Sequence, residues 1–285
     1  MADLTTNTYH THISSQSRWY NLNFKEVWQY RDLIVLFTKR TFALTYKQTV
    51  LGPVWIFLNP LISSIIYAFV FGGIAGIGTD GVPSLLFYLC SNAIWLFFAN
   101  CVNKNAQTFT ANAGVFGKVY FPRLTIPISN VLASVVQFFV QMILVLGVLA
   151  YYVAIDEVHP NWNYCLLIPV VLIHLGLLGL GCGIIISSMT TKYRDLSILV
   201  GFGVQLWMYI TPIVYPMSQL GSGIMGFILM LNPVTASVEL FRYAILGQGA
   251  LMPGFLALSW AITIAVVVIG VMIFNKVEKT FMDTV

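Results

Sequence analysis

The sequence predicts an all-α integral membrane protein with six transmembrane helices, an N-terminal amphipathic interface helix and two short re-entrant helices between spans 5 and 6. The 285-residue chain is 58% hydrophobic and only 8% charged, whereas soluble domains carry about 25% charged residues. Six long apolar runs contain no Asp, Glu, Lys or Arg, and about 20 such residues cross a hydrocarbon core as one helix. A soluble fold is therefore excluded.

The first 48 residues are predicted to form a cytoplasmic segment. Between Phe24 and Arg40, apolar and charged residues alternate at roughly helical spacing, which is typical of an amphipathic helix lying in the membrane interface. Trp28 and Tyr30 would then lie at headgroup depth, and a soluble cap helix is the alternative. Charged residues precede the first long apolar run, so no cleavable signal peptide is expected.

Residues 49–285 are expected to form the transmembrane domain. Asn59-Pro60 and Thr211-Pro212 place a helix breaker inside the first and fifth spans, where each is expected to kink its helix. Such kinks would either allow a pore to widen or serve packing alone. The six spans are predicted at about 50–72, 83–102, 125–152, 165–189, 196–215 and 254–275.

The distribution of basic residues predicts the orientation. If the N-terminus is cytoplasmic, every Lys and Arg except Arg242 falls on the cytoplasmic side, as the positive-inside rule requires. Both termini are therefore expected in the cytoplasm. The net charge of +4 is too small, and too scattered, for nucleic-acid binding.

Two short helices are predicted between the fifth and sixth spans. The apolar run Ile224–Leu231 is too short to cross a bilayer, and Asn232-Pro233 is expected to begin a second helix, in which Glu239 and Arg242 can pair. Backbone that turns back at membrane depth must be buried in protein or line a wet cavity. An outer gate containing Glu239, Arg242 and Tyr243 is the hypothesis, and an extracellular loop lying on the membrane is the alternative.

Four motifs occur in a fixed order along the chain. They are Tyr46–Trp55 (YKQTVLGPVW), Lys118–Arg123 (KVYFPR), Tyr193–Asp195 (YRD) and Asn232-Pro233. Together they resemble the permease subunit of the ABC-2 class of ABC transporters, in the branch that exports O-antigen, teichoic-acid and capsule-like polysaccharides.

The resemblance implies a homodimer of six-span subunits that works with two copies of an ABC ATPase subunit. Such an assembly moves an undecaprenyl-diphosphate-linked glycan outward across the cytoplasmic (inner) membrane of a bacterium. O-antigen is favoured over teichoic acid or capsule. No cofactor is expected in this chain, since the partner ATPase would bind ATP and Mg²⁺.

The sequence independently lacks a phosphate loop of the G-x-x-x-x-G-K-[ST] type. Around Gly117-Lys118, the nearest match, Asn112 stands where the first glycine is required and Val119 replaces Ser or Thr. The chain is therefore predicted to be a transport subunit and not an enzyme.

The longest internal cytoplasmic loop, residues 103–124, is predicted to receive force from the ATPase. A short helix over Thr108–Lys118 would act as the coupling helix, and a passive solvated loop is the alternative. Pro122 fixes the backbone before the chain re-enters the membrane. The candidate coupling residues are Asn112, Phe116, Lys118 and Tyr120.

Two further sets of candidates concern the polysaccharide. Basic residues at cytoplasmic span ends can grip the diphosphate of a lipid carrier, although such residues also satisfy the orientation rule or bind anionic lipids; they are Arg40, Lys47, Arg123 and Arg194. Aromatic rings in the first and fifth spans could stack on sugars, although aromatic residues also face lipid; they are Trp55, Phe57, Tyr67, Phe202, Trp207, Tyr209 and Tyr215.

Competing classes of function have weaker support. An ion-coupled transporter normally places ionisable residues inside its spans, whereas all ten acidic residues of this chain lie outside the six spans predicted here. A membrane glycosyltransferase or acyltransferase would have to use Asp156, Glu157 and His159, which are more simply a solvated turn. His174 is expected to be a neutral, hydrogen-bonded imidazole, and Gly179 with Gly183 is expected to pack helices within one subunit.

Overall fold

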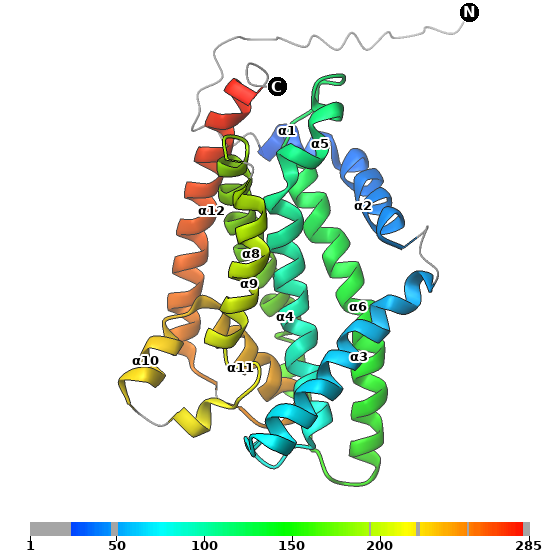
Figure 1. The fold of residues 1–285 in the computed structure, drawn as a ribbon, viewed down its shortest axis with the longest axis vertical. Helices are drawn as coiled ribbons and strands as arrows, with labels where there is room; N and C mark the ends of the chain where they lie inside the picture. The colour runs from blue at the N-terminus through cyan, green and yellow to red at the C-terminus, as the bar shows by residue number, and fades with distance from the viewer. Residues whose placement is uncertain (1–23, 47–50, 194, 221–222, 250, 282–285) are drawn as a thin grey trace, which may run out of the picture.

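The computed structural model describes residues 24–46, 51–193, 195–220, 223–249 and 251–281, which contain helices and no strands. Long helices run roughly side by side (Figure 1). The long or apolar ones are α3 (Trp55–Tyr67), α4 (Ser84–Ala106), α6 (Thr125–Ala154), α8 (Ile168–Thr190), α9 (Leu196–Ile210) and α12 (Pro253–Phe281).

Short elements lie at the two ends of this bundle. One end, which we call the α5 end, holds α1 (Phe24–Gln29), α5 (Thr108–Phe116) and the C-terminal part of α12. The other, which we call the α10 end, holds α10 (Ile224–Met230) and α11 (Pro233–Leu246), as Figure 1 shows. Helix α2 (Arg31–Tyr46), α7 (Trp162–Cys165) and the 3-10 turns Gly52–Val54 and Met217–Leu220 complete the described elements.

Helix α4 is the centre of the bundle. It is predominantly apolar and most of its side chains are buried, as expected for a helix surrounded by protein. It contacts α3, α6, α8, α9 and α11. Its aromatic residues join a core shared with these helices, for example Phe97 against Phe138 of α6 and Phe98 against Trp207 of α9.

Glycines let α8 approach its neighbours closely. A Cβ atom at Gly179 would lie 2.5 Å from Cys101 Cβ, and one at Gly183 would clash with Asn105 Cβ; both partners are on α4. A Cβ at Gly270 of α12 would meet the Gly181 carbonyl oxygen at 2.9 Å. Small residues permit such backbone contacts, so the prediction that Gly179 and Gly183 pack helices within one subunit is confirmed.

Five helical segments among the described residues are long and apolar enough to cross a membrane. They are Gly52–Ile74, Ser84–Ala106, Thr125–Ala154, Trp162–Thr190 and Pro253–Glu278. Each overlaps a predicted span. The predicted fifth span, 196–215, is wrong as a continuous helix, because α9 has 15 residues and ends at Ile210.

The two predicted helix breakers act differently. Pro60 is buried inside α3, and the helix continues beyond it. From Ala68 to Ile74 the same helix continues as a π-helix. Pro212, by contrast, follows Thr211 in an extended conformation (φ −98°, ψ 139°), so it lies beyond the end of α9 and does not kink a continuous helix.

Helices α1 and α2 are partly amphipathic in the structure. Val27 and Ile34 are buried, whereas Trp28 is 70% exposed. Helix α2 packs on α6, and Tyr30, Leu33 and Phe37 pack against a second apolar cluster at the α5 end, which includes Phe109, Phe116, Phe121 and Phe274. We call these four rings and their apolar neighbours the α5-end cluster.

The α4–α8 contact predicts the effect of adding one methyl group. Gly183→Ala should lower the free energy of unfolding by about 1–3 kcal/mol, because the new Cβ overpacks against Asn105. The matched control is Gly147→Ala in α6, where a Cβ meets nothing within 4 Å. Thermal unfolding in detergent measures both variants, and equal melting temperatures would contradict the close contact.

Candidate functional site

At the α10 end, a short extended segment follows α9 and is buried in the protein. Thr211, Ile213 and Val214 are almost inaccessible to solvent. Their backbone groups lie outside a helix, so they need other hydrogen-bond partners. Two of these partners are side chains: the Tyr88 hydroxyl of α4 donates to the Val214 carbonyl oxygen (3.4 Å), and Arg242 of α11 donates to the Pro212 carbonyl oxygen (2.7 Å).

Asn232 connects this segment to two helices. Its Nδ2 donates to Thr211 Oγ1 (2.9 Å), and its Oδ1 accepts from Trp207 Nε1 and from the Val234 backbone N–H, both at 3.1 Å. The last bond caps the N-terminus of α11, where Pro233 occupies the first turn. The prediction that Asn232-Pro233 begins a helix is confirmed.

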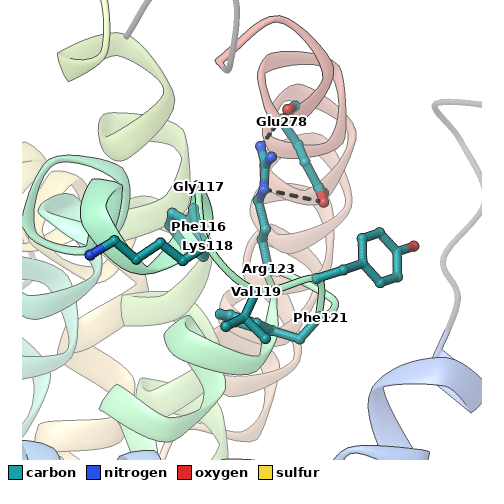
Figure 2. Close-up of a pocket in the computed structure, with 8 residues that line it drawn as sticks. Phe116, Gly117, Lys118, Val119, Phe121, Arg123 and Glu278 are labelled. Atoms are coloured by element: carbon teal, nitrogen blue, oxygen red, sulfur yellow. Dashed lines mark hydrogen bonds and ion pairs between the residues drawn. The ribbon is translucent and has the colours of Figure 1, made fainter.

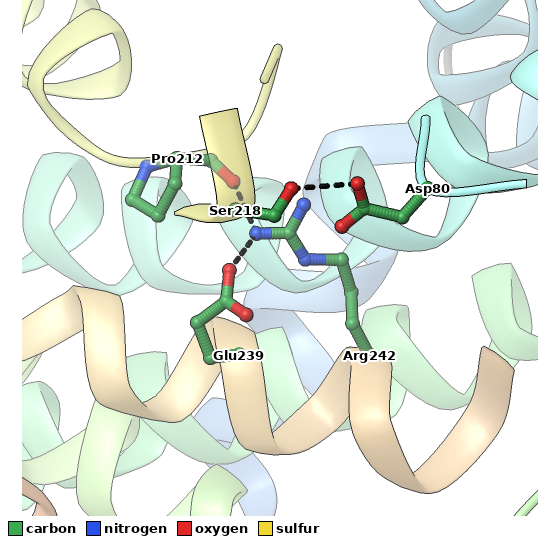
Figure 3. Close-up of polar contacts among 5 residues, drawn as sticks. All are labelled: Asp80, Pro212, Ser218, Glu239 and Arg242. Atoms are coloured by element: carbon green, nitrogen blue, oxygen red, sulfur yellow. Dashed lines mark hydrogen bonds and ion pairs between the residues drawn. The ribbon is translucent and has the colours of Figure 1, made fainter. Parts of the chain in front are cut away.

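Arg242 and Glu239 form a buried ion pair on α11 (Figure 3), as their spacing of three residues predicted. Each side chain is almost completely inaccessible to solvent. Arg242 Nη2 also donates to the Pro212 carbonyl oxygen (2.7 Å), and its guanidinium lies 4.8 Å from the centre of the Phe87 ring. The ion pair therefore joins α11 to the extended segment and to α4.

A second contact crosses the same end. Ser218 Oγ donates to the Asp80 carboxylate (2.6 Å), and Gln219 Nε2 donates to the Gly78 carbonyl (3.1 Å), which joins the turn after the extended segment to the loop before α4. Figure 3 shows Asp80 and Ser218 on the side of α11 from which the Arg242 side chain projects. Tyr243 is half-buried and lies edge-on to Tyr164, with ring centroids 5.0 Å apart.

The predicted aromatic candidates lie on α3 and α9, which both contact α4, except Tyr215, which follows the extended segment after α9. Tyr67 of α3 donates a hydrogen bond to Met208 Sδ of α9 (3.6 Å), which brings the two helices together. Tyr215 donates to the Tyr209 carbonyl (3.1 Å). Exposed rings are those of Trp55, Phe202 and Tyr209, whereas those of Phe57, Tyr67, Trp207 and Tyr215 are half-buried.

At the α5 end, the loop after α4 forms helix α5, within the predicted range Thr108–Lys118. Phe116 at its end is buried in the α5-end cluster and contacts Phe109 and Phe121. The following residues border a cavity of about 280 Å³ (Figure 2). Phe109 also stacks on Phe274 of α12, with ring centroids 4.5 Å apart.

Arg123 closes one side of this cavity by pairing with Glu278 of α12 (Figure 2). Its Nε lies 3.7 Å from Glu278 Oε1, another of its nitrogens donates to the Glu278 backbone oxygen, and its guanidinium lies over the Phe116 ring. Arg123 therefore joins the loop before α6 to α12 at the α5 end, and its predicted role as a diphosphate ligand stays a prediction.

The predicted coupling residues divide into two groups. Asn112 donates to the Thr108 carbonyl within α5 (3.0 Å), and Phe116 is buried, so both support the helix. Lys118 and Tyr120 are exposed. Desolvation of the Tyr120 phenol, and then the nearby Glu26 and Glu278 carboxylates, raise its pKa above the ordinary value for tyrosine.

The sequence pattern that defines the ABC-2 type transporter family matches residues 32–246. The chain belongs to the ABC-2 type transporter family. It is 27% identical over 253 residues to the "O-antigen export system permease protein RfbA" of Klebsiella pneumoniae, a match that covers 88% of this chain and 94% of that protein. It is 28% identical over 222 residues to the protein of the same name in Myxococcus xanthus, with 76% and 82% covered.

Two of the four predicted diphosphate ligands of this ABC-2 chain, Lys47 and Arg194, lie outside the described residues. Arg40 is exposed on α2 and borders a separate cavity.

His174 hydrogen-bonds to Ser237 of α11 (2.8 Å) and to Thr263 of α12 (2.9 Å), which confirms that its imidazole is hydrogen-bonded.

Sequence reasoning did not identify the partners that complete this ABC-2 fold. Glu278 lies 155 positions from Arg123, and Thr211 lies 21 positions from Asn232. No local spacing connects such pairs. One sequence signal indicated that Arg242 has an unusual environment: among the Lys and Arg residues, it alone was predicted to lie on the outer side of the membrane.

The buried pair predicts a non-additive stability loss. Arg242→Met should lower the free energy of unfolding by about 3–5 kcal/mol, because it leaves the Glu239 carboxylate buried without its counterion. The double variant Glu239→Gln with Arg242→Met should be more stable than Arg242→Met alone. Thermal unfolding of both variants tests this, and an additional loss in the double variant would contradict the pairing.

Proposed function

We propose that this chain is the transmembrane permease subunit of an ATP-driven ABC exporter that moves undecaprenyl-diphosphate-linked O-antigen across the cytoplasmic membrane of a bacterium. Its membership of the ABC-2 family and its likeness to O-antigen export permeases, over 94% of the length of one of them, carry the proposal. A separate ATPase subunit supplies ATP hydrolysis. Both termini lie in the cytoplasm, as the distribution of basic residues favours.

The parity of the fold supports six membrane crossings. Helix α1 and the C-terminal part of α12 lie at the same end of the bundle (Figure 1), so an even number of crossings must connect them. Five segments are long enough by themselves, and α9 with the extended segment after it makes the sixth. Helices α10 and α11 then form a re-entrant pair on the outer side.

The polysaccharide conduit lies between two copies of this chain. The centre of one bundle is filled by α4 and its buried neighbours, which leaves no space for a sugar chain within it. Helix α3 keeps most of its surface uncovered in the single chain, and α9 exposes Phe202 and Tyr209. Aromatic faces bind sugars weakly and with little specificity, which suits a moving polymer.

The outer gate is formed by the network around Arg242. Asn232 and Arg242 hold the extended segment against α11 and α4. Movement of α11 would therefore move the outer end of α9, which lies at one side of the proposed conduit. Tyr243 joins the same unit through its ring contact with Tyr164.

The transport reaction can be tested in reconstituted vesicles. The chain and its ABC ATPase partner should move lipid-linked O-antigen only when ATP is supplied, because no phosphate loop occurs in this sequence. The measurement is protection of the polysaccharide from an added glycosidase. Movement of the polymer by this chain alone, driven by a proton or sodium gradient, would contradict the proposal.

The exposed residues after α5 should transmit ATP hydrolysis to transport. Replacing Lys118 and Tyr120 together by Ala should reduce export at least about tenfold, a loss of about 1.4 kcal/mol of coupling, while the ATPase activity of the complex remains. The measured quantity is polymer moved per ATP hydrolysed.

The control for the coupling test is Trp162→Ala. Trp162 is a 65% exposed aromatic residue in α7, packed near α11 at the opposite end of the bundle. It should leave the ratio of transport to hydrolysis unchanged. The coupling role is wrong if both variants give the same ratio as the unmodified chain.

A further inference from the structure

A second cavity at the α5 end is lined by Arg40, a predicted diphosphate ligand, and by Asn112, a predicted coupling residue. It measures about 340 Å³ and lies between α2, the C-terminal end of α4, α5 and the N-terminal part of α6. Two basic residues and several neutral polar residues line it, and none of the described lining residues is acidic. The polar residues that matter here are Arg40, Thr41, Lys104, Gln107, Asn112 and Asn130.

The two cations lack acidic partners. Lys104 is half-buried in the last turn of α4, and its Nζ donates only to the neutral Gln137 Oε1, at 3.4 Å. Within the described parts of the chain, no carboxylate lies within 4.0 Å of Lys104 or Arg40. Taking an ammonium group out of water without a counterion is costly, so an anion in the cavity would stabilise Lys104.

The position of the cavity limits what that anion can be. Lys104 ends one membrane-crossing helix, and Asn130 lies in the second turn of another. This depth is where the headgroups of a bilayer lie. Leu44 and Ile126 add apolar surface to the lining, against which an acyl or prenyl chain can pack.

We propose that this cavity binds the phosphate group of an anionic lipid. Arg40 and Lys104 supply the positive charge: the planar guanidinium of arginine and the compact ammonium group of lysine both bind phosphate oxygens. Basic pockets between transmembrane helices are known to bind lipid headgroups. Amide and hydroxyl groups of Gln107, Asn112 and Thr41 supply further hydrogen bonds. The proposal rests on the membrane placement of the chain and not on its cargo.

The cavity would also connect lipid binding to the coupling helix. Arg40 and Thr41 belong to α2, whereas Asn112 belongs to α5. A phosphate bound between them bridges the interface helix and the proposed ATPase contact. Two lipids share this chemistry: a membrane phospholipid such as phosphatidylglycerol, and the diphosphate carrier of the polysaccharide.

Native mass spectrometry of the permease with its partner ATPase tests the proposal. The complex is titrated separately with phosphatidylglycerol, phosphatidylcholine and undecaprenyl diphosphate. Lys104→Gln and Arg40→Gln should each weaken binding of the anionic lipid about tenfold, because each removes a charge-assisted hydrogen bond. Lys104→Arg keeps the charge and should retain binding.

The matched control is Lys39→Gln. Lys39 precedes Arg40 on α2 and carries the same charge, but it does not line the cavity. Retained binding in this variant supports a defined site. Tighter binding of undecaprenyl diphosphate identifies the site with the carrier, and tighter binding of phosphatidylglycerol identifies it with a membrane lipid. Equal losses in Lys39→Gln and Lys104→Gln, or binding of phosphatidylcholine with the same affinity, overturn the proposal.

Discussion

Every backbone N–H and C=O at bilayer depth must find a partner within the protein, and this constraint organises the α10 end. Helix α9 stops before the extended segment, so the carbonyl groups of Pro212 and Val214 need donors from elsewhere. Arg242 supplies one and the Tyr88 hydroxyl, at 3.4 Å from Val214 O, supplies the other. A charged residue is tolerated in this apolar region because Glu239 neutralises it. The positions of α11, α9 and α4 therefore depend on one another.

The buried apolar side chains of the bundle form two clusters. The larger one surrounds α4 and extends to the buried face of α11. The α5-end cluster joins α5 to α2, α8 and α12. Because protein interiors are close-packed and resist compression, a displacement of α5 would be shared with α2 and α12. The two clusters are connected along α6 and α8, which contribute residues to both.

Much of the fold was predictable because long apolar runs have few alternative structures. The helices α4, α6 and α12 lie where hydrophobicity placed them, and local rules gave the start of α11 and the Glu239–Arg242 pair. The rule for proline failed at Pro212, since a proline can end a helix as well as kink it. The pairing of Arg123 with Glu278 was not predicted, because Glu278 comes from the other end of the chain. The position of a basic residue at a span end does not reveal whether it is already paired.

The π-helical stretch at the end of α3 affects how this helix can be studied. A π-helical hydrogen bond spans five residues where an α-helical one spans four, so the angular register of Trp55–Tyr67 does not continue through Ala68–Ile74. A helical wheel drawn at one constant period would misplace the residues after Tyr67 by an angle that grows toward Ile74. Spin labels or introduced thiols that are meant to probe one face of α3 therefore have to be positioned with one rotation angle per residue up to Tyr67 and a different angle after it.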